Sequence, residues 1–381
     1  MILRMKKRIR INFISTWGIR CGIAEYSKFL INSMRTIDYL NVRVFPVSNA
    51  YIKNPFYYFR LALSTGRDVD IVHIQYHPSF FEISPVLFSY FPLLIMGLKL
   101  LSKAKIVITI HELGNRKDPG VKLNILLMRV AQSVIIHSTD LFYELKMYGF
   151  SEEKLTRIPH GTLVGFEKNT EECKRNLGYY DKKVLTIFGF IQPNKGHDTF
   201  IRAMSYLPEN TIVLILGVAR SKTSEKYVRT LKELVSSLKL DERVIFMGFV
   251  NDEAMSELIG ATDIAVFPYR HIEISGALHR ILGYKVPSVT SDLSYFKEIQ
   301  ENYDCIEIFK TDNYIDLANT IIKLIENQDY LKHLTRKCEK FIELTNWDLI
   351  ANRTFGCYLE AVAVHAASIY SDSIQRERIS K

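Results

Sequence analysis

The chain has 381 residues, of which 48% are hydrophobic and 24% are charged, a balance typical of soluble globular proteins. This length favours two domains, each with its own core. The five cysteines are scattered without a CxxC pair, which argues against a disulfide framework and a cysteine-based zinc site and favours a reducing, cytoplasmic compartment.

The net charge of +9 is unevenly distributed. Residues 1–108 hold 15 Lys and Arg against 5 Asp and Glu, which leaves 35 basic and 36 acidic residues for the remainder. This asymmetry indicates an anionic partner for the first part of the chain, such as a membrane surface. No recognisable nucleic-acid-binding motif accompanies the charge, so we expect no nucleic acid to bind. A basic face that contacts only solvent is the other interpretation.

Two segments bear on membrane targeting. The first residues, MILRMKKRIRINFIS, lack the apolar stretch of a secretory signal, so none is expected. Residues 83–101 form the most apolar segment, but two prolines, a glycine and a lysine interrupt it, and it is short for a membrane span. It is expected either to be a buried helix or to rest on a bilayer surface.

Apolar, β-branched runs alternate with helix-like segments in the first half, which predicts a parallel sheet covered by helices. The strands predicted here are residues 9–14, 42–46, 71–76, 105–110, 134–137 and 155–158. The predicted helices are residues 23–34, 85–101, 121–132 and 140–147.

A polar, charged segment, residues 161–183, predicts a linker with a short helix before a second alternation begins. The strands predicted after it are residues 184–190, 211–216, 244–247, 264–267, 288–290 and 306–309. The predicted helices are residues 196–206, 224–238, 252–259, 276–284 and 314–326, with a helical tail over 330–369. Asn251 or Asp252 is expected to cap the helix at 252–259. The two alternations predict two facing, doubly wound α/β domains with ligands in a cleft between the carboxyl ends of the sheets.

The most informative motif is FGFIQPNKGHDTFIRA, residues 188–203. An apolar strand leads into a short loop, then Lys195 and Gly196, then an amphipathic helix. A lysine beside the free N–H groups of a helix N-terminus is suited to binding a diphosphate. A solvated loop lysine is the alternative reading.

A glycine loop and a set of histidines are the candidates in the first half. Gly18 and Gly22, in TWGIRCGIAEYSKFL, let the chain turn tightly between the first strand and its helix. The histidines at or near strand ends, where cleft residues lie, are His73, His77, His111, His137 and His160. No short histidine pair on one helix face is present, so no metal site is predicted.

These motifs together resemble the retaining GT-B glycosyltransferases of the family-4 (group 1) type, over most of the chain. The strings that carry the resemblance are CGIAEYS at 21–27, ITIHEL at 108–113, residues 188–203, residues 244–270 and HIEISGALHRILGYKVPSVTSD at 271–292. The resemblance implies the GT-B fold, with domains at 1–165 and 166–345 and a C-terminal helix over 346–381 that crosses back to the first domain.

In the N-terminal domain, the resemblance assigns four residues to substrates. Gly22 lies in the loop that meets the donor, and His111 lies close to the transferred sugar as a catalytic residue. Tyr76 and His77 are assigned to the acceptor.

In the C-terminal domain, the resemblance assigns the donor site. Lys195 binds the diphosphate and Glu273 positions the sugar, both as catalytic residues. The other donor-binding residues are Gly248, Phe249 and Val250 for the base, through main-chain groups, and Arg270, Ser275, Gly276 and Ala277 for the sugar and phosphates.

Two positions depart from the family pattern. Phe190 stands where the family often has an arginine as a second phosphate ligand, and Arg270 or Arg220 is the candidate replacement. The second acidic residue that usually grips the ribose is absent, because Ile281 or Arg280 occupies its position.

The implied reaction moves a hexose from a nucleoside-diphosphate sugar to a glycan or lipid-linked saccharide acceptor, with retention of configuration. It requires no metal and no cofactor, and is expected in the cytoplasm or peripherally on the inner face of the membrane. The alternatives are a catalytically inactive nucleotide-sugar-binding protein of the same fold, favoured by the two departures, and a nucleotide-sugar epimerase. Base, sugar, linkage and oligomeric state stay open.

Overall fold

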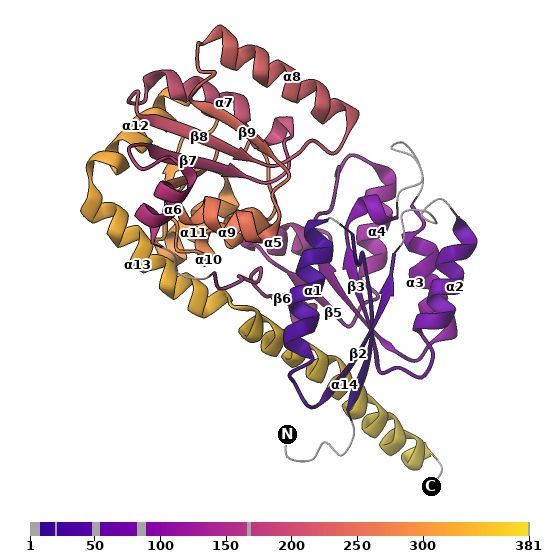
Figure 1. The fold of residues 1–381 in the computed structure, drawn as a ribbon. Helices are drawn as coiled ribbons and strands as arrows, with labels where there is room; N and C mark the ends of the chain where they lie inside the picture. The colour runs from indigo at the N-terminus through magenta and orange to yellow at the C-terminus, as the bar shows by residue number, and fades with distance from the viewer. Residues whose placement is uncertain (1–7, 20, 48–53, 82–88, 166–168, 380–381) are drawn as a thin grey trace. The chain divides into compact units, whose positions relative to one another are not determined.

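The computed structural model describes residues 8–19, 21–47, 54–81, 89–165 and 169–379 (Figure 1). Contacts divide this described chain into unit 1, Met1–Gly161 with Trp347–Lys381, and unit 2, Thr162–Asn346. The predicted boundaries followed residues 165 and 345.

Unit 1 contains a six-stranded parallel sheet within its described residues, in the order β2-β1-β3-β4-β5-β6. The strands are β1 (Ile9–Ser15), β2 (Leu40–Pro46), β3 (Ile71–Tyr76), β4 (Lys105–Ile110), β5 (Ser133–Ile136) and β6 (Leu155–Arg157). Every residue of β3 is buried, as expected for a strand covered on both faces.

Helices cover both faces of this sheet (Figure 1). They are α1 (Gly22–Met34), α2 (Pro55–Thr65), α3 (Phe91–Leu101), α4 (Pro119–Met128), α5 (Thr139–Met147) and α14 (Trp347–Ile379), with short 3₁₀ turns η2 (Pro78–Phe80) and η3 (Glu152–Lys154). The C-terminal helix α14 packs against α1 and β4 and is therefore part of unit 1.

Unit 2 has its own six-stranded parallel sheet in the part of the chain described, in the order β12-β11-β10-β7-β8-β9. The strands are β7 (Lys183–Phe188), β8 (Thr211–Leu216), β9 (Val244–Gly248), β10 (Ile264–Phe267), β11 (Ser288–Ser291) and β12 (Ile306–Phe309). Chain order reverses between β7 and β10, which makes their carboxyl ends the topological switch point.

The helices of unit 2 lie on both faces of this sheet (Figure 1). They are α6 (Thr170–Leu177), α7 (His197–Ala203), α8 (Lys222–Ser237), α9 (Asp252–Gly260), α10 (Gly276–Gly283), α11 (Ser294–Tyr303), α12 (Tyr314–Glu326) and α13 (Gln328–Thr345), with 3₁₀ turns η4 (Pro193–Lys195) and η5 (Met204–Tyr206). Asn251 is the residue that caps α9, since its side chain accepts a hydrogen bond from the Ala254 N–H at 2.9 Å.

The predicted strands are all found among the described residues, but two helices were not predicted. The α2 sequence, PFYYFRLALST, is rich in aromatic residues, which have weak helix propensity. The α11 sequence, SYFKEIQENY, is mostly polar and buries only three residues. The predicted helix over 85–101 begins at Phe91, and residues 85–88 lie outside the described chain.

The apolar helix α3 is buried along one side only, which confirms the expectation of a buried helix in part. Phe91, Leu94, Ile95 and Leu98 are buried in the unit 1 core, whereas other apolar residues of the helix are exposed. Among the described residues, no helix is both long and apolar enough to span a membrane.

Candidate functional site

At the switch point of unit 2, the loop after β7 is hydrogen-bonded to the end of β8 and packs against the loop after β10. The Gly189 and Ile191 N–H groups donate to the carbonyls of Leu216 and Val218, at 3.0 and 3.1 Å. Gly196 has φ +64°, and a Cβ there would lie 1.8 Å from the Pro268 carbonyl oxygen, so only glycine fits. The loop after β7 therefore runs directly against the loop after β10.

Lys195 lies at this switch point, one residue before Gly196. Its ammonium group is 3.6 Å from the centroid of the Tyr269 ring, in the loop after β10. Burial raises the pKa of Tyr269, which keeps the phenol neutral beneath the cation. The cation–π contact fixes the lysine at the carboxyl edge of the sheet, where ligands of doubly wound folds bind.

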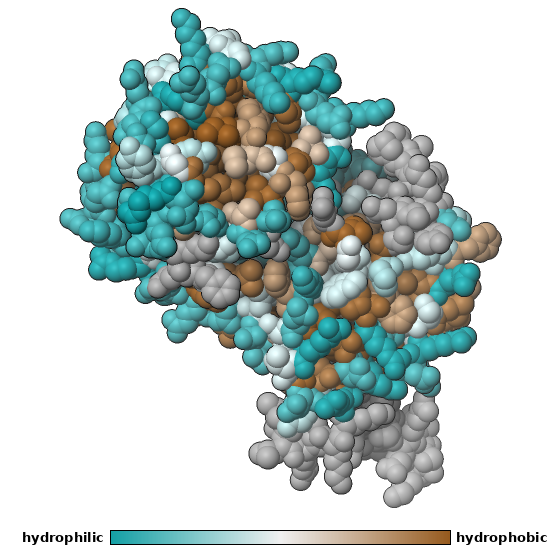
Figure 2. All heavy atoms as spheres, in the orientation of Figure 1, coloured by the Kyte–Doolittle hydropathy of each residue, from teal (hydrophilic) through white to brown (hydrophobic). Residues whose placement is uncertain are grey.

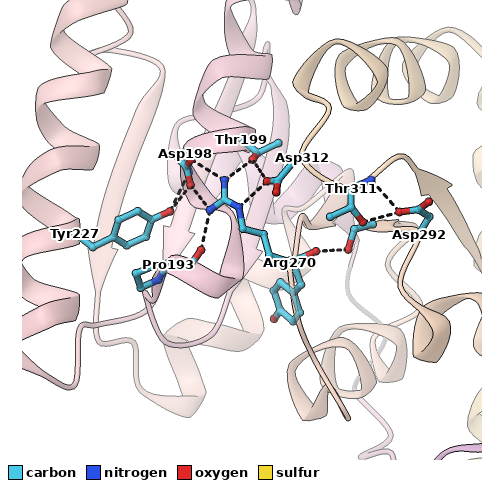
Figure 3. Close-up of polar contacts among 10 residues, drawn as sticks. Pro193, Asp198, Thr199, Tyr227, Arg270, Asp292, Thr311 and Asp312 are labelled. Carbon is cyan, nitrogen blue, oxygen red and sulfur yellow. Dashed lines mark hydrogen bonds and ion pairs between the residues drawn. The ribbon is translucent and has the colours of Figure 1, made fainter. Parts of the chain in front are cut away.

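Arg270, predicted to bind the donor, is instead part of an internal network (Figure 3). Its guanidinium donates to both carboxylate oxygens of Asp198, at 2.9 and 2.8 Å, and to Asp312 at 2.6 Å. It also donates to the Pro193 carbonyl at 2.8 Å and the Thr199 hydroxyl at 3.1 Å. A guanidinium has five N–H donors, and all five are used here, which argues against a role in donor binding.

Arg220, the other candidate for the missing arginine, stacks on the residue that replaces it. Its guanidinium carbon lies 4.2 Å from the centroid of the Phe190 ring. The side chain is exposed, and within the described chain no carboxylate lies at ion-pair distance from it. The Arg220 guanidinium therefore stacks on Phe190, beside the loop that carries Lys195.

The loop before α10 presents backbone donors at the same switch point. The buried Ser275 hydroxyl accepts a hydrogen bond from the Leu278 N–H at 3.2 Å, so the Ser275 side chain serves as the helix cap. Gly276 and Ala277 form the first helical turn, whose N–H groups have no intrahelical acceptor. Glu273 is half-buried in the preceding loop.

The positions expected for a second acidic residue have other roles. Ile281 is fully buried in the core of unit 2. The Arg280 guanidinium carbon lies 5.9 Å from the centroid of the Phe188 ring, at the end of β7. Neither residue has a carboxylate, and the structure places Ile281 in the core and Arg280 near Phe188.

The segment predicted to contact the base follows β9. Gly248 has φ +69°, and the chain turns there. Phe249 is 55% exposed, whereas Val250 is half-buried against the core. An exposed aromatic ring at a sheet edge is a candidate surface for stacking.

In unit 1, three of the predicted histidines gather around one tyrosine ring. Tyr26 of α1 lies with its ring centroid 4.7 Å from His111, 5.4 Å from His137 and 5.2 Å from His160. Trp347, at the start of α14, lies 5.0 Å from the same ring. Burial lowers the pKa of His137 to about 4 and that of His160 to about 3, so both are neutral at pH 7.

The predicted acceptor residues differ in exposure. Tyr76 is fully buried, with its ring stacked on Phe81 and its hydroxyl accepting from Asn124 at 3.0 Å, and its assignment to the acceptor stays a prediction. Its strand is covered on both faces, as the apolar run at 71–76 predicts. His77 is partly exposed, with Nε2 3.3 Å from Glu112 Oε2.

The remaining predicted residue, Gly22, begins α1 and is exposed, with open space where a Cβ would lie. In the described ranges of both units, no group of three or more His, Cys, Asp and Glu side chains is arranged to hold a metal ion.

The family relationship rests on unit 2. Residues 169–341 match the family described as Glycosyl transferases group 1. Unit 2 is a group 1 glycosyltransferase domain. This confirms the family resemblance, and the family-4 subtype stays a prediction.

Two curated relatives extend the match at low identity. Mannosylfructose-phosphate synthase of Agrobacterium fabrum is 26% identical over 217 residues, which cover 54% of this chain and 48% of that protein. Alpha-galactosylglucosyldiacylglycerol synthase of Streptococcus pneumoniae is 27% identical over 219 residues, 55% of each chain. The chain thus spans about half the length of the curated relatives it matches.

Solved structures match almost the whole chain. HepE of Anabaena, in complex with UDP-glucose, has a TM-score of 0.73 at 17% identity and covers 95% of this chain and all of its own. Sucrose-phosphate synthase of Thermosynechococcus elongatus has a TM-score of 0.75 at 16% identity and covers 94% of this chain and all of its own. Together with the two doubly wound units of this chain, these matches confirm the predicted GT-B fold class.

Proposed function

We propose that the protein is a retaining glycosyltransferase that moves a hexose from a nucleoside-diphosphate sugar to a glycan or lipid-linked saccharide. The observation that carries this proposal is Lys195, held over the Tyr269 ring at the switch point of a group 1 glycosyltransferase domain. HepE, which shares the fold, has been solved with UDP and with UDP-glucose, which supports a nucleotide sugar as the donor class.

Two cations and a helix N-terminus would stabilise the leaving diphosphate. Lys195 and Arg220 are the cations, because Arg270 already has protein partners for all its donors. The N–H groups of Gly276 and Ala277, at the start of α10, supply further donors. A charge-assisted hydrogen bond contributes about 1.5–3 kcal/mol, which corresponds to about a 10- to 100-fold effect on affinity.

The remaining roles follow the resemblance. His111 and Glu273 position the sugar, Gly22 meets the donor, and the main chain of residues 248–250 holds the base. His77 contributes to the acceptor side. No residue is assigned as a nucleophile, so attack occurs on the front face with the departing phosphate as base. Electrostatic stabilisation and positioning then supply most of the rate, without a metal or cofactor.

Turnover of the donor tests the proposal. The full-length protein, incubated with UDP-, GDP- or ADP-sugars, should slowly release one nucleoside diphosphate even into water. Lys195→Ala should abolish this release, whereas Lys226→Ala, an exposed lysine on α8, should leave it unchanged.

The second candidate function is a nucleotide-sugar-binding protein without catalysis. Two departures from the family pattern favour it: Phe190 replaces the arginine, and Ile281 or Arg280 replaces the second acidic residue. Nucleotide binding without release of nucleoside diphosphate, across varied donors and acceptors, would support this function over the transferase.

An anionic membrane surface is the proposed location of the acceptor, with the protein on the inner, cytoplasmic face. In unit 1, α3 packs against both α2 and α4, and none of the three helices contains Asp or Glu. Their exposed hydrophobic residues are Phe56, Phe59, Leu93, Met96, Leu100, Leu101, Leu123 and Leu126. We call this surface the apolar–basic face, because the exposed cations Arg60, Lys99, Lys103, Lys122 and Arg129 lie on or beside these helices.

Apolar side chains among cations are suited to the boundary of an anionic bilayer. Figure 2 shows brown apolar atoms beside teal polar atoms at the α2–α3 edge of unit 1. The exposed apolar residues add to the charge argument from the sequence, since a solvated basic face does not require them.

Sedimentation with lipid vesicles tests the membrane proposal. Binding to vesicles with anionic lipid should weaken as salt rises. Met96→Glu/Leu100→Glu, at residues 54% and 79% exposed, should weaken binding at least about tenfold. Met147→Glu, an exposed residue of α5, is the matched control and should bind as before. Binding that ignores lipid charge, salt and the double substitution would disprove the membrane proposal.

A further inference from the structure

Gln75 joins two histidines in the interior of unit 1. It lies in β3 and is fully buried. Its side-chain oxygen, Oε1, lies 2.6 Å from His111 Nε2, and its Nε2 lies 3.1 Å from His73 Nε2. The amide thus connects His111, which follows β4, with a histidine inside the sheet.

The chain of contacts continues from His73 to the C-terminal helix. His73 Nδ1 lies 2.6 Å from the Tyr358 hydroxyl on α14, and that hydroxyl lies 3.9 Å from Met34 Sδ on α1. The Thr109 hydroxyl, on β4, lies 2.8 Å from His73 Nε2. His73 is fully buried and its pKa is lowered to about 3, so it is neutral and has one N–H to donate.

These contacts define a direction for the hydrogen bonds. A carboxamide oxygen only accepts, so His111 Nε2 must carry the proton shared with Gln75. The Gln75 amide then donates to His73 Nε2, which leaves the His73 proton on Nδ1, where it meets Tyr358. The Tyr358 hydroxyl in turn has Met34 Sδ as its acceptor. Each group donates to the next, from His111 to Met34.

The tautomer of His111 follows from this direction. With its proton on Nε2, the neutral imidazole has a lone pair on Nδ1, and within the described chain no donor lies at hydrogen-bond distance from that atom. The His111 side chain is also partly exposed. Burial, followed by the neighbouring histidines, lowers the pKa of His111 well below its ordinary value, so Nδ1 stays unprotonated at pH 7.

We infer that Gln75 is a positioning residue that holds His111 in the Nε2–H tautomer, so that Nδ1 accepts a hydrogen bond from a hydroxyl of the bound sugar. This inference rests on the proposed function, because it takes His111 to contact the sugar. It explains a fully buried glutamine in a strand that is covered on both faces, since a leucine would fill the same space without fixing the imidazole.

Nuclear magnetic resonance identifies the His111 tautomer by a measurement that does not depend on enzymatic turnover. In the full chain labelled with ¹⁵N-histidine, a two-bond ¹H–¹⁵N correlation at pH 7 should show the Nε2–H pattern for His111, assigned by its loss in His111→Asn. Gln75→Leu should change that pattern. Asn124→Leu, at a buried amide on α4 that bonds Tyr76 and Ser89, should not. An Nδ1–H tautomer in the native protein, or an unchanged pattern in Gln75→Leu, would overturn the inference.

A pH profile separates positioning from a structural role. The titratable groups acting on His111 are His137, His160, His77 and His73, and the Tyr26 ring packs on it. Gln75→Glu places a carboxylate against His111, which raises its pKa and protonates Nδ1. The acid limb of kcat/KM for donor turnover should therefore move to higher pH, while Gln75→Leu should lower kcat/KM about tenfold at every pH.

The two kinds of failure are distinguishable. If the native protein does not turn over any donor, the proposed function fails, and the tautomer measurement still decides the role of Gln75. If turnover is normal and its acid limb does not move in Gln75→Glu, the positioning role is disproved although the transferase stands. Thermal unfolding of each variant shows that the chain is folded at the temperature used.

Discussion

At the residue scale, the structure distinguishes Arg270, whose donors are all used within the fold, from Lys195 and Arg220, the cations proposed to bind the diphosphate. Lys195 could be predicted from the sequence, because strand, loop, lysine, glycine and helix are consecutive. The pairing of Arg270 could not, because Asp198 and Asp312 lie 72 and 42 residues away in the sequence. The partners of Tyr76 could not be predicted either, since its hydroxyl bonds Asn124, which lies 48 residues away.

Arg270→Ala should destabilise unit 2 without removing the proposed ligand cations. It leaves half-buried Asp198 without its main donor, at a cost of about 1–3 kcal/mol. Chemical denaturation should show this loss, and Arg229→Ala, at an exposed arginine of α8, should show none. Nucleotide affinity, measured where the variant is still folded, should change little. If Arg270→Ala is as stable as the native protein but no longer binds nucleotide, Arg270 contacts the donor after all.

At the element scale, the central strands were predictable because they are apolar runs buried on both faces, as in β3, β8 and β10. Helices α2 and α11 were not, since their stability comes from tertiary packing rather than from propensity or a broad apolar stripe. One buried ion pair shows such a tertiary constraint. Lys174 of α6 is 3% exposed and lies 2.8 Å from Asp263, which also accepts from the Val184 N–H at 2.7 Å.

Asp263→Ala should be strongly destabilising because it leaves the Lys174 ammonium buried and unpaired. Breaking such a pair costs about 3–5 kcal/mol. The double variant Lys174→Met/Asp263→Leu should recover much of that loss, because it removes both charges. Urea unfolding of the native protein and of these two variants measures both changes in the free energy of unfolding. A single variant as stable as the native protein would show that the pair contributes nothing.

At the scale of the whole molecule, the two units should respond differently to acid. In unit 1, buried His73 and His137 have pKa values lowered by burial to about 3 and about 4. The unfolded chain titrates near pH 6.5, so it binds more protons than the folded state below that pH. The contribution of these two neutral histidines to the stability of unit 1 is fully present above about pH 6.5 and is lost as the pH falls toward 4 and 3.

Each of these two histidines should therefore cost unit 1 about 2 kcal/mol at pH 5. His111 and His160 act in the same direction. In unit 2, His197 behaves likewise, with a pKa of about 3. The Asp198 pKa is raised by burial, but hydrogen bonds from Arg270 and Tyr227 lower it more, so that contribution is lost only below about pH 4.

Tryptophan fluorescence can separate the units, because Trp17 and Trp347 both lie in unit 1. We expect the fluorescence transition in urea to move to lower urea between pH 7 and pH 5. Circular dichroism, which reports both units, should develop a second phase. A single transition that shifts equally by both probes would contradict separate acid responses.

The sequence could predict the fold class because two alternating patterns with one linker leave few topologies. It could not predict which cations are neutralised or which tautomer His111 adopts, since both depend on contacts between distant segments. The central claim therefore concerns the switch point of unit 2, where Lys195 and Arg220 are assigned to a diphosphate.

Calorimetric titration of the full-length protein with UDP, GDP and ADP tests that claim most directly. We predict that one nucleotide binds, and that Lys195→Ala and Arg220→Ala each weaken its affinity at least about tenfold. Lys226→Ala should bind as the native protein does. Binding that Lys195→Ala leaves unchanged, or no binding of any of the three nucleotides, would contradict the account.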